Sequence, residues 1–309
     1  MSSMHTALVG VRHSSWAGRA VRVAAAFGLA ACAQLALAAP LLLWEVTGGA
    51  APVWLFGSVH VCRSDCYPIP PAVDARFKRA DLLAVELDPT RAEVSSAMTG
   101  AGGESEALRS QLGPSDWKRL VRQVESMGLP EEMLAGLTAP MASVFVAMAV
   151  AGKSGLSPLL GVDLHFISRA QHDGKGLVEL ETVERQMQAL GAGSPREQLD
   201  SLRASIRAAE DGTLKASLEE VVAAWRRGDA AGLSAAVTKA QAADPASRTM
   251  FKDLFDRRNR EMADAIASLA RGGRSVFVVV GSGHLAGAGS IPGLLAQRGF
   301  KVRQIDSRE

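Results

Sequence analysis

The distribution of apolar residues singles out two short runs that end in nearly the same four residues. Residues 53–56 are apolar and lead into Gly-Ser-Val-His, which ends at His60, and residues 276–280 are apolar and lead into Gly-Ser-Gly-His, which ends at His284. Short apolar runs that are rich in β-branched and aromatic residues and stop at a glycine are typical of buried strands. Ligands bind at the carboxyl ends of strands in open α/β sheets. We therefore expect two neighbouring parallel strands that place both imidazoles in one cleft.

The remaining pattern combines further strands with long helical segments. Four more short apolar runs predict strands, at 42–46, 81–88, 177–180 and 300–305. The first of these is expected to form a hairpin with the strand that follows it. Helical periodicity dominates at about 90–160 and 194–272, and residues 141–150 are apolar on all sides, which indicates a buried helix. This order predicts an α/β fold with a central, mostly parallel sheet, flanking helices and a large helical insertion between two related halves.

The composition is that of a folded protein with little net charge. The chain has 309 residues, of which 48% are apolar and 21% are charged, and its net charge is +2. This apolar content is enough to bury a large core. So small a net charge argues against a nucleic-acid-binding surface, and we expect no nucleic-acid partner.

Residues 1–38 have the features of a secretory signal peptide. They contain three arginines and no acidic residue, followed by an apolar stretch and the small-residue sequence Ala36-Leu37-Ala38. We expect cleavage after Ala38, export to the periplasm, and a single mature domain at 39–309. The alternative is a membrane-anchored lipoprotein, because the Leu-Ala-Ala-Cys sequence that ends at Cys32 is similar to a lipobox.

Two cysteines, Cys62 and Cys66, follow His60 closely. Export permits a disulfide between them, which would hold the loop beside the histidine. Metal binding by the two thiolates is the alternative, although a C-x3-C pair without a second pair is weak evidence for zinc.

Two glutamates also stand at the ends of predicted strands. Glu86 follows residues 82–85, and Glu181 follows residues 177–180. Two imidazoles and two carboxylates suit manganese, cobalt or iron, and one carboxylate could instead activate water. The alternative is that the histidines are hydrogen-bonded core residues and the acids are solvated.

Three further residues permit two interpretations each. Asp163 begins a predicted helix, where it either caps the helix or belongs to the site. Arg258 and Asn259 lie on a long predicted helix. They form a surface salt bridge and a surface amide, or they orient a site carboxylate and bind a substrate carbonyl or carboxylate.

Together these segments resemble the TraB/GumN family, which includes the Tiki metalloproteases. The resemblance extends from about residue 43 to the C-terminus. The matching segments are Leu-Trp-Glu-Val from residue 43, Leu-Phe-Gly-Ser-Val-His from 55, Tyr-Pro from 67, Val-Glu-Leu from 85, Gly-Val-Asp from 161, Leu-Glu-Thr from 180, Trp-Arg-x-Gly-Asp from 225, Arg-Asn-x-x-Met-Ala from 258 and Val-Gly-x-Gly-His-Leu from 280.

This resemblance implies a fold and an activity. Tiki-like proteins use the two histidines of the repeated motif and an acid in metal-dependent peptide hydrolysis, with manganese or cobalt suggested. Their fold is similar to that of erythromycin esterases and ChaN-like haem-binding proteins. We therefore expect an exported metal-dependent hydrolase that acts on a peptide or small-molecule substrate. The alternative is a protein that binds haem or a small peptide in the same cleft without turnover.

The residues expected at this site fall into two overlapping groups. The expected ligands of the divalent metal (manganese, cobalt or iron) are His60, His284, Glu86 and Asp163. The expected catalytic residues are Glu86, Glu181, Arg258 and Asn259.

Overall fold

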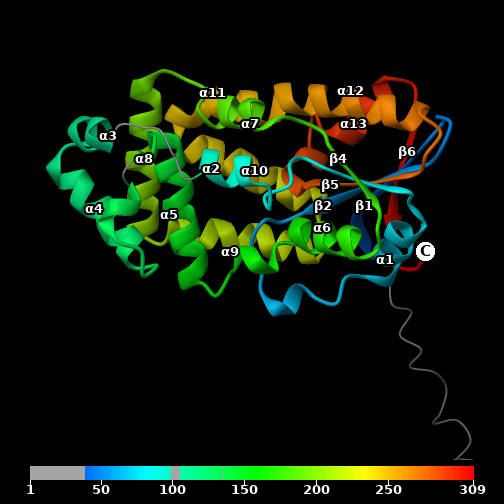
Figure 1. Cartoon of the computed structure of the whole chain (residues 1–309), viewed down its shortest axis with the longest axis horizontal. Coiled ribbons are helices and arrows are strands. Elements are labelled where there is room, and N and C mark those ends of the chain that lie inside the picture. Colours follow the sequence, from blue (N-terminus) through cyan, green and yellow to red (C-terminus); the bar gives the residue numbers. More distant parts are fainter. Residues whose placement is uncertain (1–38, 99–104, 135) are drawn as a thin grey trace, which may run out of the picture. The chain divides into compact units, whose positions relative to one another are not determined.

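A mixed sheet lies at the centre of the fold (Figure 1). The structure is a computed structural model that describes residues 39–98, 105–134 and 136–309, so the predicted signal peptide and Cys32 lie outside the described residues. Within the described residues the strands are β1 (Pro40–Thr47), β2 (Val53–Ser58), β3 (Leu82–Val85), β4 (Gly176–Glu179), β5 (Val276–Gly281) and β6 (Lys301–Asp306). They lie in the order β4-β3-β5-β2-β1-β6.

The central strands run parallel, as the sequence predicts. β5 pairs in parallel with both β2 and β3, and β3 pairs in parallel with β4. β1 is antiparallel to β2 and to β6, so the predicted hairpin is confirmed. The neighbouring parallel arrangement of β2 and β5 is also confirmed, with Val53 opposite Val276 and Ser58 opposite Gly281. These strands are buried along nearly their whole length, which explains why they are continuous apolar runs rather than alternating ones.

Helices cover both faces of the sheet (Figure 1). The covering helices are α1 (Pro71–Arg79), α6 (Val162–His172), α12 (Arg258–Arg271) and α13 (Ile291–Gln297). Helices α1 and α6 lie on one side of the sheet, and α12 and α13 lie on the other. Phe77 of α1, Phe166 of α6 and Phe277 of β5 pack ring against ring, with centroids 5.0–5.7 Å apart. This aromatic cluster anchors α1 and α6 to the sheet.

The other described helices lie mostly to one side of the sheet (Figure 1). They are α2 (Ala92–Met98), α3 (Ser105–Leu112), α4 (Pro114–Glu125), α5 (Ala139–Lys153), α7 (Val183–Leu190), α8 (Pro195–Glu210), α9 (Thr213–Arg226), α10 (Ala230–Ala243) and α11 (Arg248–Phe251). Helices α3, α4, α5 and α8 share a second core that contains Leu120, Leu134 and Leu202. None of the described helices is long and apolar enough to cross a membrane.

Helix α5 corrects one expectation. Residues 141–150 lie within it, but only part of its circumference is fully buried, and Ser143 and Val144 are half-buried. The all-round apolar pattern predicted complete burial, so that prediction is wrong for this side of α5. Its half-buried side lines a pocket between the helices.

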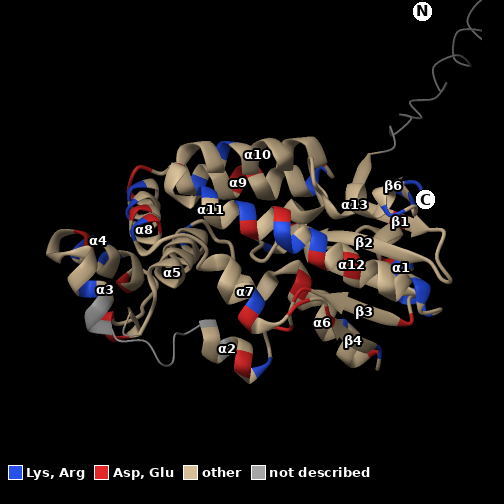
Figure 2. Ribbon diagram, turned by 90° about the horizontal axis from the view of Figure 1, so that it is seen from above, with Lys and Arg blue, Asp and Glu red and all other residues tan. Residues whose placement is uncertain are grey.

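Charges are mixed along the surface. Figure 2 shows basic and acidic residues interspersed along α12, and Arg257, which directly precedes α12, pairs with Glu261 of this helix. Arg298 of the following segment also pairs with Asp264 of α12. Such pairing of opposite charges is typical of a solvated helix face.

Candidate functional site

The carboxyl ends of three neighbouring parallel strands carry the site residues. His60 follows β2, and Glu86 follows β3. His284 lies in a 3-10 turn, Ser282–Leu285, directly after β5. β5 lies between β2 and β3, so the three side chains start from adjacent positions on one edge of the sheet. This is the edge where parallel sheets bind ligands.

Gly281 marks the point on which these side chains converge. A Cβ atom at Gly281 would lie 3.3 Å from Glu86 Oε1, 3.5 Å from His60 Nε2 and 3.6 Å from His284 Cδ2. Conversely, a Cβ atom at Gly57 would lie 3.1 Å from the Cα atom of Ser282. Gly57 thus leaves room for the second copy of the motif, whereas a Cβ at Gly281 would be tight only against the Glu86 carboxylate.

The two histidines nevertheless occupy different environments. The His60 side chain is 65% exposed, whereas the His284 side chain is 6% exposed. The chain continues as an irregular segment after β2 but turns at once into a 3-10 helix after β5, which folds His284 inward. The repeat therefore places one accessible and one buried imidazole at the same point.

Asn259 fixes the orientation of His284. His284 Nδ1 lies 2.6 Å from Asn259 Oδ1, and Asn259 Nδ2 donates a hydrogen bond to the Gly289 carbonyl at 2.9 Å. Because the amide nitrogen is engaged by that carbonyl, its oxygen faces the ring and accepts from Nδ1–H. Nε2 is then the unprotonated nitrogen, and it lies 3.7 Å from Glu86 Oε1. Burial lowers the pKa of His284 to about 4, so the imidazole is neutral at neutral pH.

Arg258 holds two buried carboxylates beside this imidazole. Its Nη2 donates to Glu86 Oε2 at 2.7 Å, and its Nε donates to Glu181 Oε2 at 2.8 Å. Nη2 also bonds Glu181 Oε1, so the Glu181 contact is bidentate. Arg258 Nη1 lies 3.4 Å from His284 Nε2. Arg258 and Asn259 are only 2% and 3% exposed, so the alternative of a surface salt bridge and a surface amide is wrong.

The two glutamates respond differently to burial. Burial alone would raise the pKa of Glu86, but the charges of His284 and Arg258 and the Gly281 amide, which donates at 2.5 Å, hold it at about 2. Burial raises the pKa of Glu181 above its usual value despite the bond to Arg258. Glu86 is therefore an ionised carboxylate at the convergence point, while Glu181 faces Arg258.

Asp163 interacts with the exposed histidine. Its Oδ2 lies 3.3 Å from His60 Nδ1, and its negative charge raises the pKa of His60 above the usual value. Helix α6 is capped at Gly161 and no side chain caps it, so the alternative of Asp163 as N-cap is wrong. The amide of Val162 donates to the Val59 carbonyl at 3.0 Å, which docks the start of α6 against the His60 segment.

The loop beyond His60 is closed by its cysteines. Cys62 and Cys66 are joined as a disulfide pair, which favours the structural interpretation over thiolate ligands. The backbone amide of Cys62 also bonds the Ser157 carbonyl at 3.1 Å, so this loop is attached to the segment before α6.

Not all the expected residues meet at one point. His60, Glu86 and His284 do, whereas Glu181 reaches the site only through Arg258, and Asp163 only through His60. Among the described residues, no three His, Cys, Asp or Glu side chains stand close enough to hold a metal ion in their present positions.

Sequence reasoning missed one neighbour of the site, Phe255. It lies in a π-helical turn (Lys252–Arg257) between α11 and α12, and its ring centroid is 5.2 Å from that of His284. A π-helical turn often marks a functional position, but an aromatic residue in a helical segment carries no signal of it. The same turn leads directly into Arg258 and Asn259.

Comparisons with known proteins give one family. The model of the TraB/PrgY/gumN family matches residues 42–304. The protein YbaP of Escherichia coli K12, described as uncharacterised, is 24% identical over 243 residues, which cover 78% of this chain and 86% of YbaP. The Shigella flexneri protein of the same name matches equally well. No solved structure gives a significant match.

Proposed function

The chain belongs to the TraB/PrgY/gumN family, and from this premise we propose that it is an exported, metal-dependent hydrolase that acts on peptides. The observation that carries the proposal is the convergence of His60, Glu86 and His284 on Gly281, at the carboxyl edge of the parallel strands. The peptide substrate and the metal come from the resemblance to Tiki-like proteins. The exposure of His60 supports access of a substrate to this point.

The donors at this point are chemically suited to a transition metal, which would displace the proton that Asp163 favours on His60. Two imidazoles and one carboxylate are common ligands of manganese, cobalt and iron. His60 Nε2 and Glu86 Oε1 lie within 3.5 Å of the position that a Cβ of Gly281 would fill, and His284 Nε2 lies 3.7 Å from Glu86 Oε1. A bound metal would polarise a substrate carbonyl and lower the pKa of a bound water. The three side chains would have to draw closer together to hold it.

The surrounding residues have distinct tasks in this proposal. Asn259 keeps the proton of His284 on Nδ1, so that Nε2 remains a donor of its lone pair. Asp163 orients the His60 ring through Nδ1. Arg258 fixes the direction of the Glu86 carboxylate and is itself held by Glu181. We therefore assign Asn259, Arg258 and Glu181 as positioning residues, and Glu86 as ligand or general base.

Substitution of the two histidines tests this proposal. We expect His60→Ala and His284→Ala each to lose the bound manganese, cobalt or iron and to lower the rate of peptide cleavage at least 100-fold, because each removes a donor. The exposed residue His172 of α6 supplies the matched control, and His172→Ala should behave as the wild type. Metal content is measured by mass spectrometry of the purified protein, and cleavage with a peptide library.

Two results would contradict the proposal. One is equal metal content and equal cleavage in the wild type and in both site variants. The other is stoichiometric binding of haem, or of an intact peptide, without cleavage under any metal, which would establish the non-catalytic alternative instead.

A further inference from the structure

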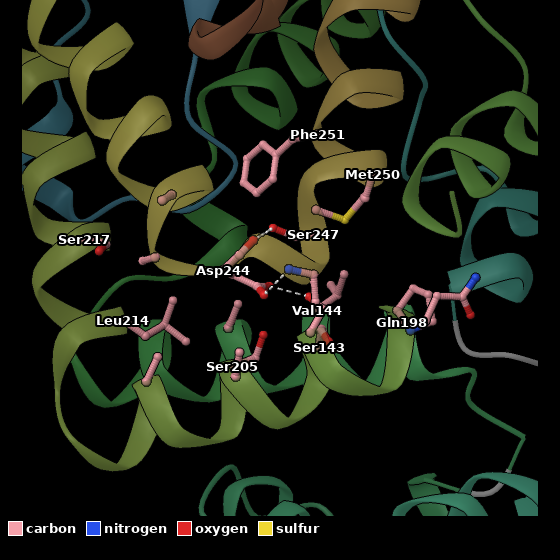
Figure 3. A pocket seen from close by; sticks show the side chains of 18 of the residues that line it. Ser143, Val144, Gln198, Ser205, Leu214, Ser217, Asp244, Ser247, Met250 and Phe251 are labelled. Carbon is pink, nitrogen blue, oxygen red and sulfur yellow. Dashed lines mark hydrogen bonds between the residues drawn. The ribbon is translucent and has the colours of Figure 1, made fainter. Parts of the chain in front are cut away.

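A pocket between the helices lies close to the candidate site and has no role in the function proposed above. It has a volume of about 550 Å³ and is enclosed by α5, α8, α9, α10 and α11 (Figure 3). Val144, Leu214, Met250 and Phe251 contribute apolar side chains to its wall. A pocket of this size and character suits a small, mostly apolar group.

The charged residues on the wall already have partners. Asp244 accepts a hydrogen bond from the Ser201 hydroxyl at 2.6 Å. Lys239 donates to Glu220 at 2.8 Å, and Glu197 is engaged in the capping box at the start of α8. Asp244 and Glu197 are held by hydroxyl and amide groups rather than by a cation, so a negatively charged ligand would be repelled, and a charge without a partner is costly to bury. The pocket therefore disfavours an acidic group, and its apolar wall favours an uncharged one.

Two hydroxyl groups on the wall remain available. Ser205 of α8 and Ser217 of α9 both line the pocket, and neither has a hydrogen-bond partner among the residues that the structure describes. Figure 3 shows both side chains at the pocket. A serine hydroxyl can donate to a carbonyl or accept from an amide, so it suits the backbone of a peptide better than a hydrocarbon chain.

Two packed aromatic rings lie between the pocket and the site. The Phe251 ring in the pocket wall is stacked on Phe255 with centroids 5.9 Å apart, and Phe255 lies 5.2 Å from His284. Phe251 is therefore within roughly 11 Å of the His284 ring, the length of about three residues of extended chain. An extended peptide that passes over these rings is long enough to reach both places.

We propose that this pocket binds an uncharged apolar side chain, such as that of leucine, methionine or phenylalanine, on an extended peptide whose backbone continues to the His60 and His284 site. The side chain lies about three residues from the point where the histidines converge. The assignment of this peptide as a substrate rests on the function proposed above. The pocket then selects substrates by the apolar area they bury.

A pair of peptides tests the assignment. Two fluorescein-labelled hexapeptides have the same alanine-rich sequence and differ only in carrying leucine or glutamate at the fourth position. Their affinities are measured by fluorescence anisotropy with the purified protein, and again with His284→Ala, so that binding is recorded without cleavage. We expect at least tenfold tighter binding of the leucine peptide to both proteins, because leucine buries apolar area in the pocket, whereas glutamate would bury a negative charge near Asp244 and Glu197.

Phenylalanine substitutions locate the binding site. Ser205→Phe and Ser217→Phe fill the pocket from different helices, and each should remove the preference for leucine. Both are checked for an unchanged circular dichroism spectrum, and two variants are used because one could fail to fold. Ser268 is an exposed serine of α12 that does not line the pocket, and Ser268→Phe should keep the tenfold preference.

The outcomes separate the pocket from the hydrolase. Equal affinity for the two peptides, or a preference that persists in both folded pocket variants, would overturn the pocket assignment even if peptides are cleaved. Pocket-dependent binding without cleavage under any metal would support the pocket assignment and overturn the hydrolase proposal alone.

Discussion

Replacing Arg258 by methionine should destabilise the protein more than replacing any neighbouring arginine. Arg258 is 2% exposed, and its guanidinium is the shared partner of Glu86 and Glu181, whose side chains are 9% and 5% exposed. Methionine retains much of the apolar stem, so the substitution mainly removes the charge and its hydrogen bonds. Glu86 and Glu181 then lose the buried cation that they share.

The magnitude follows from this loss of partners. Removing one member of a buried ion pair costs about 3–5 kcal/mol, because the remaining charge stays desolvated and unpaired. Arg258 serves two carboxylates, so we expect Arg258→Met to reach the upper part of this range, about 4–5 kcal/mol at pH 7. That is a large fraction of the stability of an ordinary domain, about 5–15 kcal/mol.

The assay is urea unfolding at 25 °C with a chelator present, followed by tryptophan fluorescence. Arg257 provides the matched control, since it precedes Arg258, is 57% exposed and pairs with Glu261 at 3.2 Å. Exposed pairs of this kind contribute at most about 1 kcal/mol, so Arg257→Met should cost no more. Adding Glu86→Gln and Glu181→Gln to Arg258→Met should recover most of the lost stability, because no buried charge remains.

Two results would refute this reasoning. One is a cost for Arg258→Met no larger than that for Arg257→Met, which would mean that the carboxylates find water or other partners. The other is a triple variant no more stable than Arg258→Met, which would show that unpaired charge is not the cause.

Two further predictions concern the cysteines and the response to acid. Thiol titration of unfolded, unreduced protein recovered from exporting cells should find Cys62 and Cys66 oxidised, and two free thiols would contradict the disulfide. The folded-state pKa of His284 is about 4 against 6.5, and that of Glu86 is about 2 against 4.5. Both pKa values are depressed on folding, so in each pH window only the unfolded state gains the proton. The free energy of unfolding should therefore fall as the pH drops from 6.5 to 4 because of His284. It should fall by about 3 kcal/mol as the pH drops from 4.5 to 2 because of Glu86. Urea unfolding across this range measures the loss, and Glu86→Gln should flatten only the more acidic part; an unchanged profile would be inconsistent with an ionised, buried Glu86.

The sequence by itself determined the framework of the sheet. The apolar runs before His60 and His284 predicted β2 and β5, and their shared ending predicted that the two strands are parallel neighbours. This was possible because a buried strand requires a short run of apolar, β-branched residues, and such a run that stops at glycine can be recognised in the sequence alone. The position of Glu86 after the next strand followed from the same rule.

Only the tertiary structure decided how the site residues differ from one another. The repeat makes His60 and His284 look equivalent, yet one is accessible and the other is buried beside Asn259. The apolar residues Met262 and Ile266 lie four and eight residues after Arg258 and place it on the buried face of α12, but this local pattern does not record which carboxylates it meets. Its partner Glu86 is 172 residues away in the chain.

The pocket between the helices is another feature that the sequence alone did not predict. Residues 141–150 predicted a helix buried on all sides, because an apolar side chain gives the same pattern whether it meets a neighbouring helix or an empty space. The packing of α8, α9 and α10 left part of α5 facing a pocket of about 550 Å³. Local sequence determines which elements form, whereas the contacts between distant elements determine which of their faces stay open, because those contacts arise only when the chain is folded.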